Sequence, residues 1–263
     1  MRLKQTGAID GAIQNIRNLQ VQLGDSRSGL TGTERRNAML QWLEDQARPV
    51  LEFLFEDGTD LTEEIEASYD RLAGSHLDGS DLYSLAMREN TRWRERIQRI
   101  DEELQRLKQF ADRRGTPVVL DTSVLMEAEP LGTIDWPSPA PVRLIVPILV
   151  VEELDNLLHD RDAARRKKAR DARRVLMGVH PGNKPTEPAP LPGMLPLITL
   201  EMLVDNDWHM RRGNNDAEIV DQALDLHRLT GRALLATCDL QQYYRAGAVD
   251  LPAILVPRKD DQS

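Results

Sequence analysis

The pattern of apolar residues changes abruptly at Gly115-Thr116-Pro117, and this change limits what the chain can fold into. Before it, apolar residues recur every three or four positions, which is typical of amphipathic helices. After it, apolar runs of four to seven residues alternate with helical patterns, which is typical of strands joined by helices. The sequence therefore predicts an all-helical domain over residues 1–115 and an α/β domain over residues 116–263.

The last helical pattern of the first half carries a seam like that of a coiled coil. Its apolar residues alternate by four and three, namely Trp93, Ile97, Ile100, Leu104, Leu107 and Ala111. A seam with this period packs against other helices. Two interpretations stay open: a bundle that packs on itself, or an arm for homo-oligomerisation or for docking a helical partner.

Two local signals subdivide the helical half further. Thr31, with Glu34 three residues later, predicts a capping box at the start of a helix. Pro49 lies inside the same helical pattern and lacks the N–H that a helix interior needs. We therefore expect Pro49 to kink or split this helix.

Apolar runs in the second half predict five strands, over residues 117–121, 142–148, 195–200, 233–237 and 253–256. Helical patterns lie between them, over residues 150–158, 163–177 and 217–230. Strands that alternate with helices form a mostly parallel sheet covered on both faces. The prolines between Pro181 and Pro196 instead predict an irregular surface loop.

Charge and cysteine content narrow the class of protein. The net charge of −9 argues against binding nucleic acid through a basic surface alone, but an enzyme can hold phosphates through metal ions. One cysteine, Cys238, excludes an internal disulfide and suits a reducing compartment. No apolar run approaches the roughly 20 residues of a membrane span. We therefore expect a cytoplasmic protein that is not embedded in a membrane.

Four acidic residues stand near the expected strand ends. Asp121 ends the first strand and Asp239 follows the fourth, while Glu153 lies in the helix after the second. Asp216 begins the helix before the fourth strand, with Asn215 expected as its N-cap. Ligands of open parallel sheets bind at the carboxyl ends of the strands, so we expect these acids to share one rim.

Carboxylates gathered this closely repel one another unless a cation lies between them. Mg²⁺ and Mn²⁺ prefer oxygen ligands and can activate a bound water as a nucleophile. Each acid taken alone could equally serve as a helix cap, and Asp121 before Thr122 and Ser123 is such a case. The joint occurrence of all four favours the metal site.

Four motifs resemble those of the PIN-domain nucleases, in the order of that family and over about residues 117–257. They are VVLDTSVLM ending at Met126, VPILVVEELD ending at Asp155, NDAEI beginning at Asn215 and LATCD ending at Asp239. The resemblance implies a three-layer α/β/α fold, Mg²⁺ or Mn²⁺, and endonucleolytic cleavage, most often of RNA. The implied metal ligands and catalytic residues are Asp121, Glu153, Asp216 and Asp239. The hydroxyls of Ser123 and Thr237 then resemble groups that orient these acids or a bound water.

Basic residues follow the helix that carries Glu153. The expected nucleic-acid contacts are Arg166, Arg170, Arg173 and Arg174 on one helix, and Arg211 and Arg212 further on. One interpretation is contact with the phosphate backbone, which gives affinity without sequence preference. The other is a solvated helix with local Arg–Asp pairs.

The function that the sequence favours is a metal-dependent endoribonuclease, which hydrolyses RNA phosphodiester bonds through metal-activated water. The alternative is a catalytically weak scaffold of the same fold, which binds RNA or protein and assembles through a helical arm. The complete set of four acids favours the enzyme. A phosphatase of the haloacid-dehalogenase type would need a second Asp two residues after Asp121, but Ser123 stands there.

Overall fold

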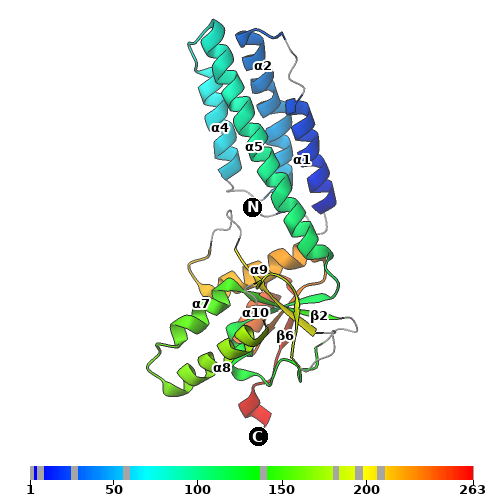
Figure 1. Ribbon diagram of the computed structural model, residues 1–263, viewed down its shortest axis with the longest axis vertical. Coiled ribbons are helices and arrows are strands. Elements are labelled where there is room, and N and C mark those ends of the chain that lie inside the picture. The colour runs from blue at the N-terminus through cyan, green and yellow to red at the C-terminus, as the bar shows by residue number, and fades with distance from the viewer. Residues whose placement is uncertain are drawn as a thin grey trace. The chain divides into compact units, whose positions relative to one another are not determined.

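The computed structural model of the chain describes residues 3–4, 9–24, 29–55, 60–136, 141–179, 184–192, 198–205 and 211–262. The chain divides into two compact units, Met1–Asp112 and Arg113–Ser263 (Figure 1). Within the described residues, no helix has the length and apolar character that crossing a membrane requires.

The first unit is helical, as the periodicity predicts. Its α-helices are α1 (Ile9–Gly24), α2 (Gly32–Trp42), α3 (Arg48–Leu54), α4 (Asp60–Ala73) and α5 (Gly79–Asp112). The long helix α5 packs along α1 and α2, and its seam residues Trp93, Ile97 and Ile100 are buried. The seam is therefore covered by helices of the same unit, as the bundle interpretation requires.

Both local signals of the helical half have structural counterparts. Thr31 N donates to Glu34 Oε2 at 2.8 Å and Glu34 N donates to Thr31 Oγ1 at 3.3 Å, which completes the capping box. Pro49 lies in the first turn of α3, directly after the π-helical turn η1 (Leu43–Ala47). There Arg48 N donates to Leu43 O, five residues back, so the regular helix is interrupted where the proline enters it.

The second unit contains a six-stranded sheet in the order β3-β4-β2-β1-β5-β6. Its strands are β1 (Thr116–Leu120), β2 (Val142–Pro147), β3 (Ala189–Pro190), β4 (Ile198–Leu203), β5 (Leu234–Thr237) and β6 (Ala253–Leu255). All pairings are parallel except that of β3 with β4. The predicted mostly parallel sheet is confirmed.

Helices cover both faces of this sheet. They are α6 (Thr122–Glu127), α7 (Ile148–Leu157), α8 (Ala163–Val179), α9 (Asn215–Thr230) and α10 (Leu240–Gly247), and a 3₁₀ turn, η2 (Lys259–Gln262), follows β6. Parallel connections are right-handed, and the chain reverses its direction across the sheet after β4. Helices α6 to α8 therefore lie on one face and α9 and α10 on the other. This is the predicted three-layer α/β/α architecture.

Two details differ from the sequence prediction. The third strand, expected over residues 195–200, is β4 at Ile198–Leu203, and residues 193–197 lie outside the described part. Its apolar pattern is interrupted by Glu201, which is buried against Arg143. Strand β3 was not predicted because it has two residues and lies among prolines, which sheets accept at their edges. Part of the proline-rich loop, including Pro181 and Pro196, also lies outside the described residues.

Candidate functional site

The carboxyl ends of the central strands β1 and β5 lie side by side. Leu120 of β1 pairs with Ala236 of β5, and Asp121 N donates to Ala236 O at 3.0 Å. Asp121 thus leaves the sheet beside Thr237 and Asp239, although the two segments are more than a hundred residues apart in sequence. Two of the four predicted acids are brought to one rim by strand pairing alone.

Asp121 is the most enclosed acid at this rim, with 6% of its surface exposed. Its Oδ2 accepts hydrogen bonds from Ser123 Oγ at 2.6 Å and from Thr237 Oγ1 at 2.7 Å. Its Oδ1 accepts from the backbone N–H of Thr122 at 2.7 Å, so Asp121 is also the N-cap of α6. The capping interpretation and the site interpretation therefore apply to the same carboxylate.

Burial raises the pKa of Asp121 above its ordinary value. The hydrogen bonds from Ser123, Thr237 and Thr122 oppose this rise, and the negative charge of Asp216 adds to it. A cation at the exposed edge of such a carboxylate stabilises its ionised form, which burial and a neighbouring acid both disfavour. Asp216 is thus close enough to Asp121 for electrostatic interaction, as the rim prediction requires.

The two predicted hydroxyl residues join the strand ends into one hydrogen-bonded unit. Thr237 Oγ1 accepts from Asp239 N at 2.9 Å, and Ser123 Oγ accepts from Cys238 N at 2.9 Å. Asp239 also caps α10, because its Oδ1 accepts from Gln241 N at 2.7 Å. Helix α10 was not predicted, since it has only eight residues, but its N-cap was one of the four acids.

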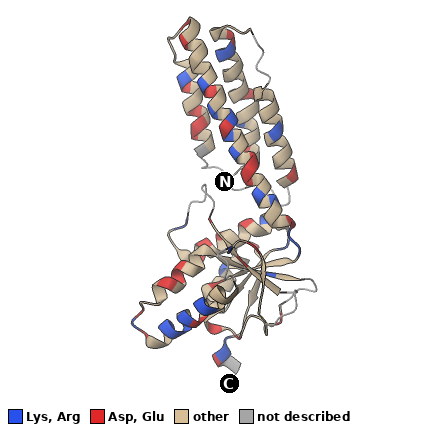
Figure 2. Ribbon diagram, in the orientation of Figure 1, with Lys and Arg blue, Asp and Glu red and all other residues tan. Residues whose placement is uncertain are grey.

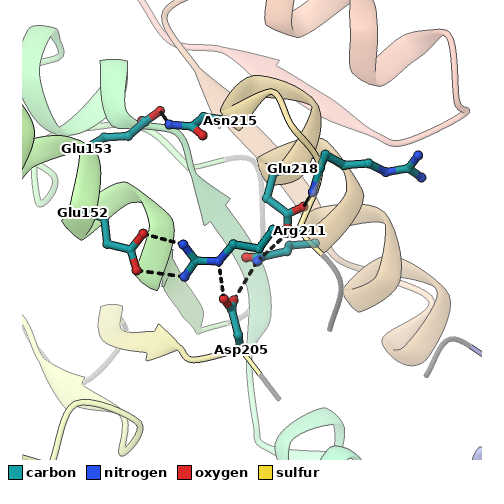
Figure 3. Close-up of polar contacts among 8 residues, drawn as sticks. Glu152, Glu153, Asp205, Arg211, Asn215 and Glu218 are labelled. Atoms are coloured by element: carbon teal, nitrogen blue, oxygen red, sulfur yellow. Dashed lines mark hydrogen bonds and ion pairs between the residues drawn. The ribbon is translucent and has the colours of Figure 1, made fainter. Parts of the chain in front are cut away.

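Glu153 on α7 is held from two sides. Thr122 Oγ1 donates to Glu153 Oε2. Asn215 Nδ2 donates to Glu153 Oε1 at 2.7 Å, as Figure 3 shows. Thr122 links these two acids, because its backbone N–H donates to Asp121 and its hydroxyl donates to Glu153. Sequence reasoning did not assign a role to Thr122, and its place inside the DTS triplet was the signal available.

Asp216 lies in the first turn of α9 and is exposed. Its Oδ2 lies 3.6 Å from Arg245 Nη1, and its backbone carbonyl accepts from Gln242 Nε2 at 2.8 Å. The N-cap of α9 is Asn214, whose Oδ1 accepts from Ala217 N at 3.0 Å, and not Asn215 as expected. The cap falls one residue earlier, so the Asn215 side chain reaches Glu153 instead.

All four predicted acids therefore belong to elements that meet at this rim, linked through hydroxyl and amide groups. Among the residues that the structure describes, no three Asp, Glu, His or Cys side chains form a group with the spacing of a metal site. Oxygen-rich donors of this kind suit Mg²⁺ or Mn²⁺, and Mg²⁺ keeps several waters and needs only one or two carboxylates.

Cys238 lies between Thr237 and Asp239 but is poorly suited to act as a nucleophile. Its side chain is buried, and this burial raises the pKa of the thiol to about 11. The thiol therefore stays protonated at neutral pH, which excludes it as a nucleophile there.

Lys and Arg gather along α8 (Figure 2). Several of the predicted nucleic-acid contacts have local partners: Arg173 lies 2.8 Å from Asp155, Arg174 lies 2.9 Å from Asp171, and Arg166 donates to backbone carbonyls. Arg170 is exposed. Surface ion pairs of this kind contribute about 1 kcal/mol or less, so a phosphate can compete for these arginines.

The second predicted pair of arginines, Arg211 and Arg212, also has acidic partners. Arg211 donates from Nη1 and Nη2 to both carboxylate oxygens of Glu152, at 2.5 and 2.8 Å, and from Nε to Asp205 Oδ2 at 2.6 Å (Figure 3). These two carboxylates raise the pKa of Arg211 further above its ordinary value, Glu152 most strongly. Arg212 Nε donates to Asp221 on α9. Sequence reasoning assigned none of these acidic partners.

This chain was compared with family models, with solved structures and with curated proteins. A family model described as the PIN domain matches residues 118–255, which is more than half of the chain. A solved structure described as "a domain of a functionally unknown protein from Methanocaldococcus jannaschii DSM 2661" is 16% identical and has a TM-score of 0.33. The match covers 54% of this chain and 91% of that one. A comparison with curated proteins finds no match. The match of the family model, over the residues that form the sheet and its rim, shows that the chain belongs to the PIN domain family.

Proposed function

We propose that the second unit is a metal-dependent endoribonuclease of the cytoplasm, which hydrolyses RNA phosphodiester bonds. PIN domains are generally nucleases, and the family match covers all four acids. The observation that carries the proposal is the state of Asp121: a buried carboxylate, with a raised pKa, joined through hydroxyls to the segments that bear Glu153 and Asp239.

The metal ligands in this proposal are Asp121, Glu153, Asp216 and Asp239. The donor set fits a hard divalent cation, because it consists of carboxylate oxygens with hydroxyls beside them. When Mg²⁺ or Mn²⁺ is bound, it acidifies a water and neutralises charge on the phosphate.

The neighbouring side chains orient the acids. Two hydroxyls, those of Ser123 and Thr237, donate to one oxygen of Asp121, which fixes the plane of its carboxylate. Thr122 and Asn215 each bind one oxygen of Glu153, which fixes this side chain in the same way. Acids that are held before the substrate arrives lose little conformational freedom on binding the cation and the phosphate.

RNA binding is assigned to the basic residues that flank the rim, above all the cluster on α8. In this proposal the backbone phosphates are contacted by four residues of α8, namely Arg166, Arg170, Arg173 and Arg174. Arg212, which precedes α9, is a further contact. Such contacts make the affinity fall with salt and leave it insensitive to base sequence. The acidic net charge of the chain makes this basic helix the favoured place for a polyanion.

The test is cleavage of an end-labelled single-stranded RNA by purified full-length protein with Mn²⁺ or Mg²⁺. We expect cleavage that EDTA abolishes and that the Asp121→Asn and Asp239→Asn variants lack while staying folded by circular dichroism. Glu187→Gln is the matched control, because Glu187 is an exposed acid of the same unit that pairs with Lys184. Full activity in both Asn variants would exclude these residues as the reaction site.

A second candidate is a scaffold that binds RNA or protein without cutting it. The observation that favours it is that the acids contact hydroxyls and amides, and no three of the described acids share a metal-like spacing. This scaffold would retain RNA in the presence of EDTA and leave it intact with either metal. Homo-oligomerisation through residues 1–115 belongs to the same proposal, and light scattering of the full chain measures it directly.

A further inference from the structure

Two consecutive residues of α7 bind two points of the segment that leads into α9 and includes its first residue. Glu152 binds Arg211 through both carboxylate oxygens, and Glu153 binds Asn215 through Oε1. The segment from Arg211 to Asn215 is therefore attached to α7 at both of its ends (Figure 3). Asp216 is the next residue of the chain.

The same segment is also fixed to the sheet and to α9. Arg211 Nε donates to Asp205, which follows β4, and Gln222 Nε2 donates to Asp205 Oδ1 at 3.0 Å. Gln222 Nε2 also donates to the fully buried Glu218 at 2.9 Å, and Glu218 Oε2 accepts from Arg212 N at 2.7 Å. One connected network thus joins α7, the end of β4 and the first turns of α9.

The guanidinium of Arg211 lies at the centre of this network. Its Nε, Nη1 and Nη2 atoms all donate to carboxylates, and two of these bonds form a fork with Glu152, a geometry that lysine cannot reproduce. These bonds engage three of the five N–H groups, so a phosphate could make a bidentate contact through Nε only by displacing Asp205, and one through both Nη atoms in the same direction only by displacing Glu152. The arrangement therefore favours a structural partner for Arg211 over an RNA phosphate.

We propose that Arg211 is a positioning residue of this site, which holds Asn215 against Glu153 and sets Asp216 at the rim. In this proposal Arg211 does not contact nucleic acid directly, which differs from the sequence expectation. The proposal rests on the proposed nuclease function, since positioning matters to catalysis only if the rim reacts. In this proposal its partner Glu152 also has a positioning role and does not contact the substrate.

Steady-state cleavage of single-stranded RNA by Arg211→Ala and Glu152→Ala separates the two roles. A positioning role predicts that both variants lose at least about tenfold in kcat, with KM within about twofold of the unchanged protein. An RNA-contacting role predicts a higher KM for Arg211→Ala, and an equal or lower KM for Glu152→Ala, because removing Glu152 frees the guanidinium. That second pattern would overturn the proposal.

Two further variants sharpen the comparison. Arg211→Lys keeps the charge but not the fork, so we expect it to restore only part of kcat. Arg17→Ala is the matched control, because Arg17 is an exposed arginine that forms a single ion pair, with Asp101, in the helical unit. It should leave kcat and KM unchanged.

Hydrogen exchange of the metal-free protein tests the positioning without any activity. Removing Arg211 or Glu152 should speed exchange of the backbone amides at residues 214–218, while Arg17→Ala leaves them unchanged. One result would separate the two proposals. If neither the unchanged protein nor any variant cuts RNA, but the amides at residues 214–218 exchange faster in Arg211→Ala and Glu152→Ala, the nuclease proposal fails and the positioning role is upheld. Unchanged exchange in both Arg211→Ala and Glu152→Ala would refute the positioning itself.

Discussion

Thr237 donates from Oγ1 to Asp121 Oδ2 at 2.7 Å, and the same Oγ1 accepts from the backbone N–H of Asp239 at 2.9 Å. One buried hydroxyl therefore serves both acids at the ends of β1 and β5. As a hydroxyl it can donate to the carboxylate and accept from the amide at once, which fixes the direction of its proton. The side chain at position 237 thus links the two strand ends, in addition to the bond between Ser123 and Cys238.

Replacing Thr237 by Val keeps the shape of the side chain and removes the hydroxyl. Asp121 then loses one donor, and the N–H of Asp239 loses its acceptor in a partly buried region. A buried polar group without a partner costs about 1–3 kcal/mol. We expect Thr237→Val to lower kcat for RNA cleavage by at least about tenfold and to lower the free energy of unfolding by this amount.

Thr237→Ser is the control for that variant, because it keeps the hydroxyl and removes only a methyl group. We expect it to retain most of the activity. Equal losses in the Ser and Val variants would show that the methyl group, and not the hydroxyl, is what position 237 contributes.

The raised pKa of Asp121 predicts how the metal-free protein responds to pH. Burial makes the folded state hold this proton more tightly than the unfolded chain does, whose ordinary pKa is 3.8. The contribution of Asp121 to the free energy of unfolding is therefore largest below pH 3.8 and falls as the pH rises through the raised pKa. Asp121→Asn has no charge at any pH and lacks this fall.

Urea unfolding in EDTA measures this effect. Between acidic and neutral pH, the free energy of unfolding of Asp121→Asn should improve relative to that of the unchanged protein. Glu187→Gln, at an exposed position, serves as the comparison. A difference between Asp121→Asn and the unchanged protein that stays constant over this range would show that ionised Asp121 is not penalised by the fold.

Binding of a divalent cation should reverse that penalty. A ligand that binds only the folded state stabilises it by about 2.7 kcal/mol at a free concentration one hundred times its Kd. Titration with Mn²⁺ should therefore raise the Tm of the unchanged protein and of Glu187→Gln, but not that of Asp121→Asn. An equal rise in all three proteins would place Mn²⁺ at another site.

The sequence predicted the parts of the site that follow from local pattern. Buried apolar runs located β1, β2 and β5, and the rule that parallel strands end at one edge brought Asp121 and Asp239 together. Contacts between distant segments carried no such pattern. The cap of α9 could have been Asn214 or Asn215, and the choice depends on backbone angles and on Glu153, 62 residues away. The sequence predicted Arg211 as an RNA contact because its positive charge can be read from the sequence. Its partner Glu152 lies 59 residues away, and no local pattern indicates this pairing.

Glu201 lies in β4, just after residue 200, where the predicted strand ended. The same residue allows a sharp test of the fold. Its side chain is fully buried and binds Arg143 Nε at 2.6 Å, with Arg113 on its other oxygen. Removing one partner of a buried ion pair costs about 3–5 kcal/mol, because an uncompensated charge remains, whereas two apolar residues can replace the pair at little cost. We expect Arg143→Met alone to destabilise the sheet by no more than this amount, because Arg113 still pairs with Glu201, and Arg143→Met with Glu201→Leu to recover much of the loss. Hydrogen exchange of the β2 and β4 amides in the full chain reports the stability of this sheet directly. A double variant as unstable as the sum of its two single variants would show that Arg143 and Glu201 act independently, against the geometry of the pair.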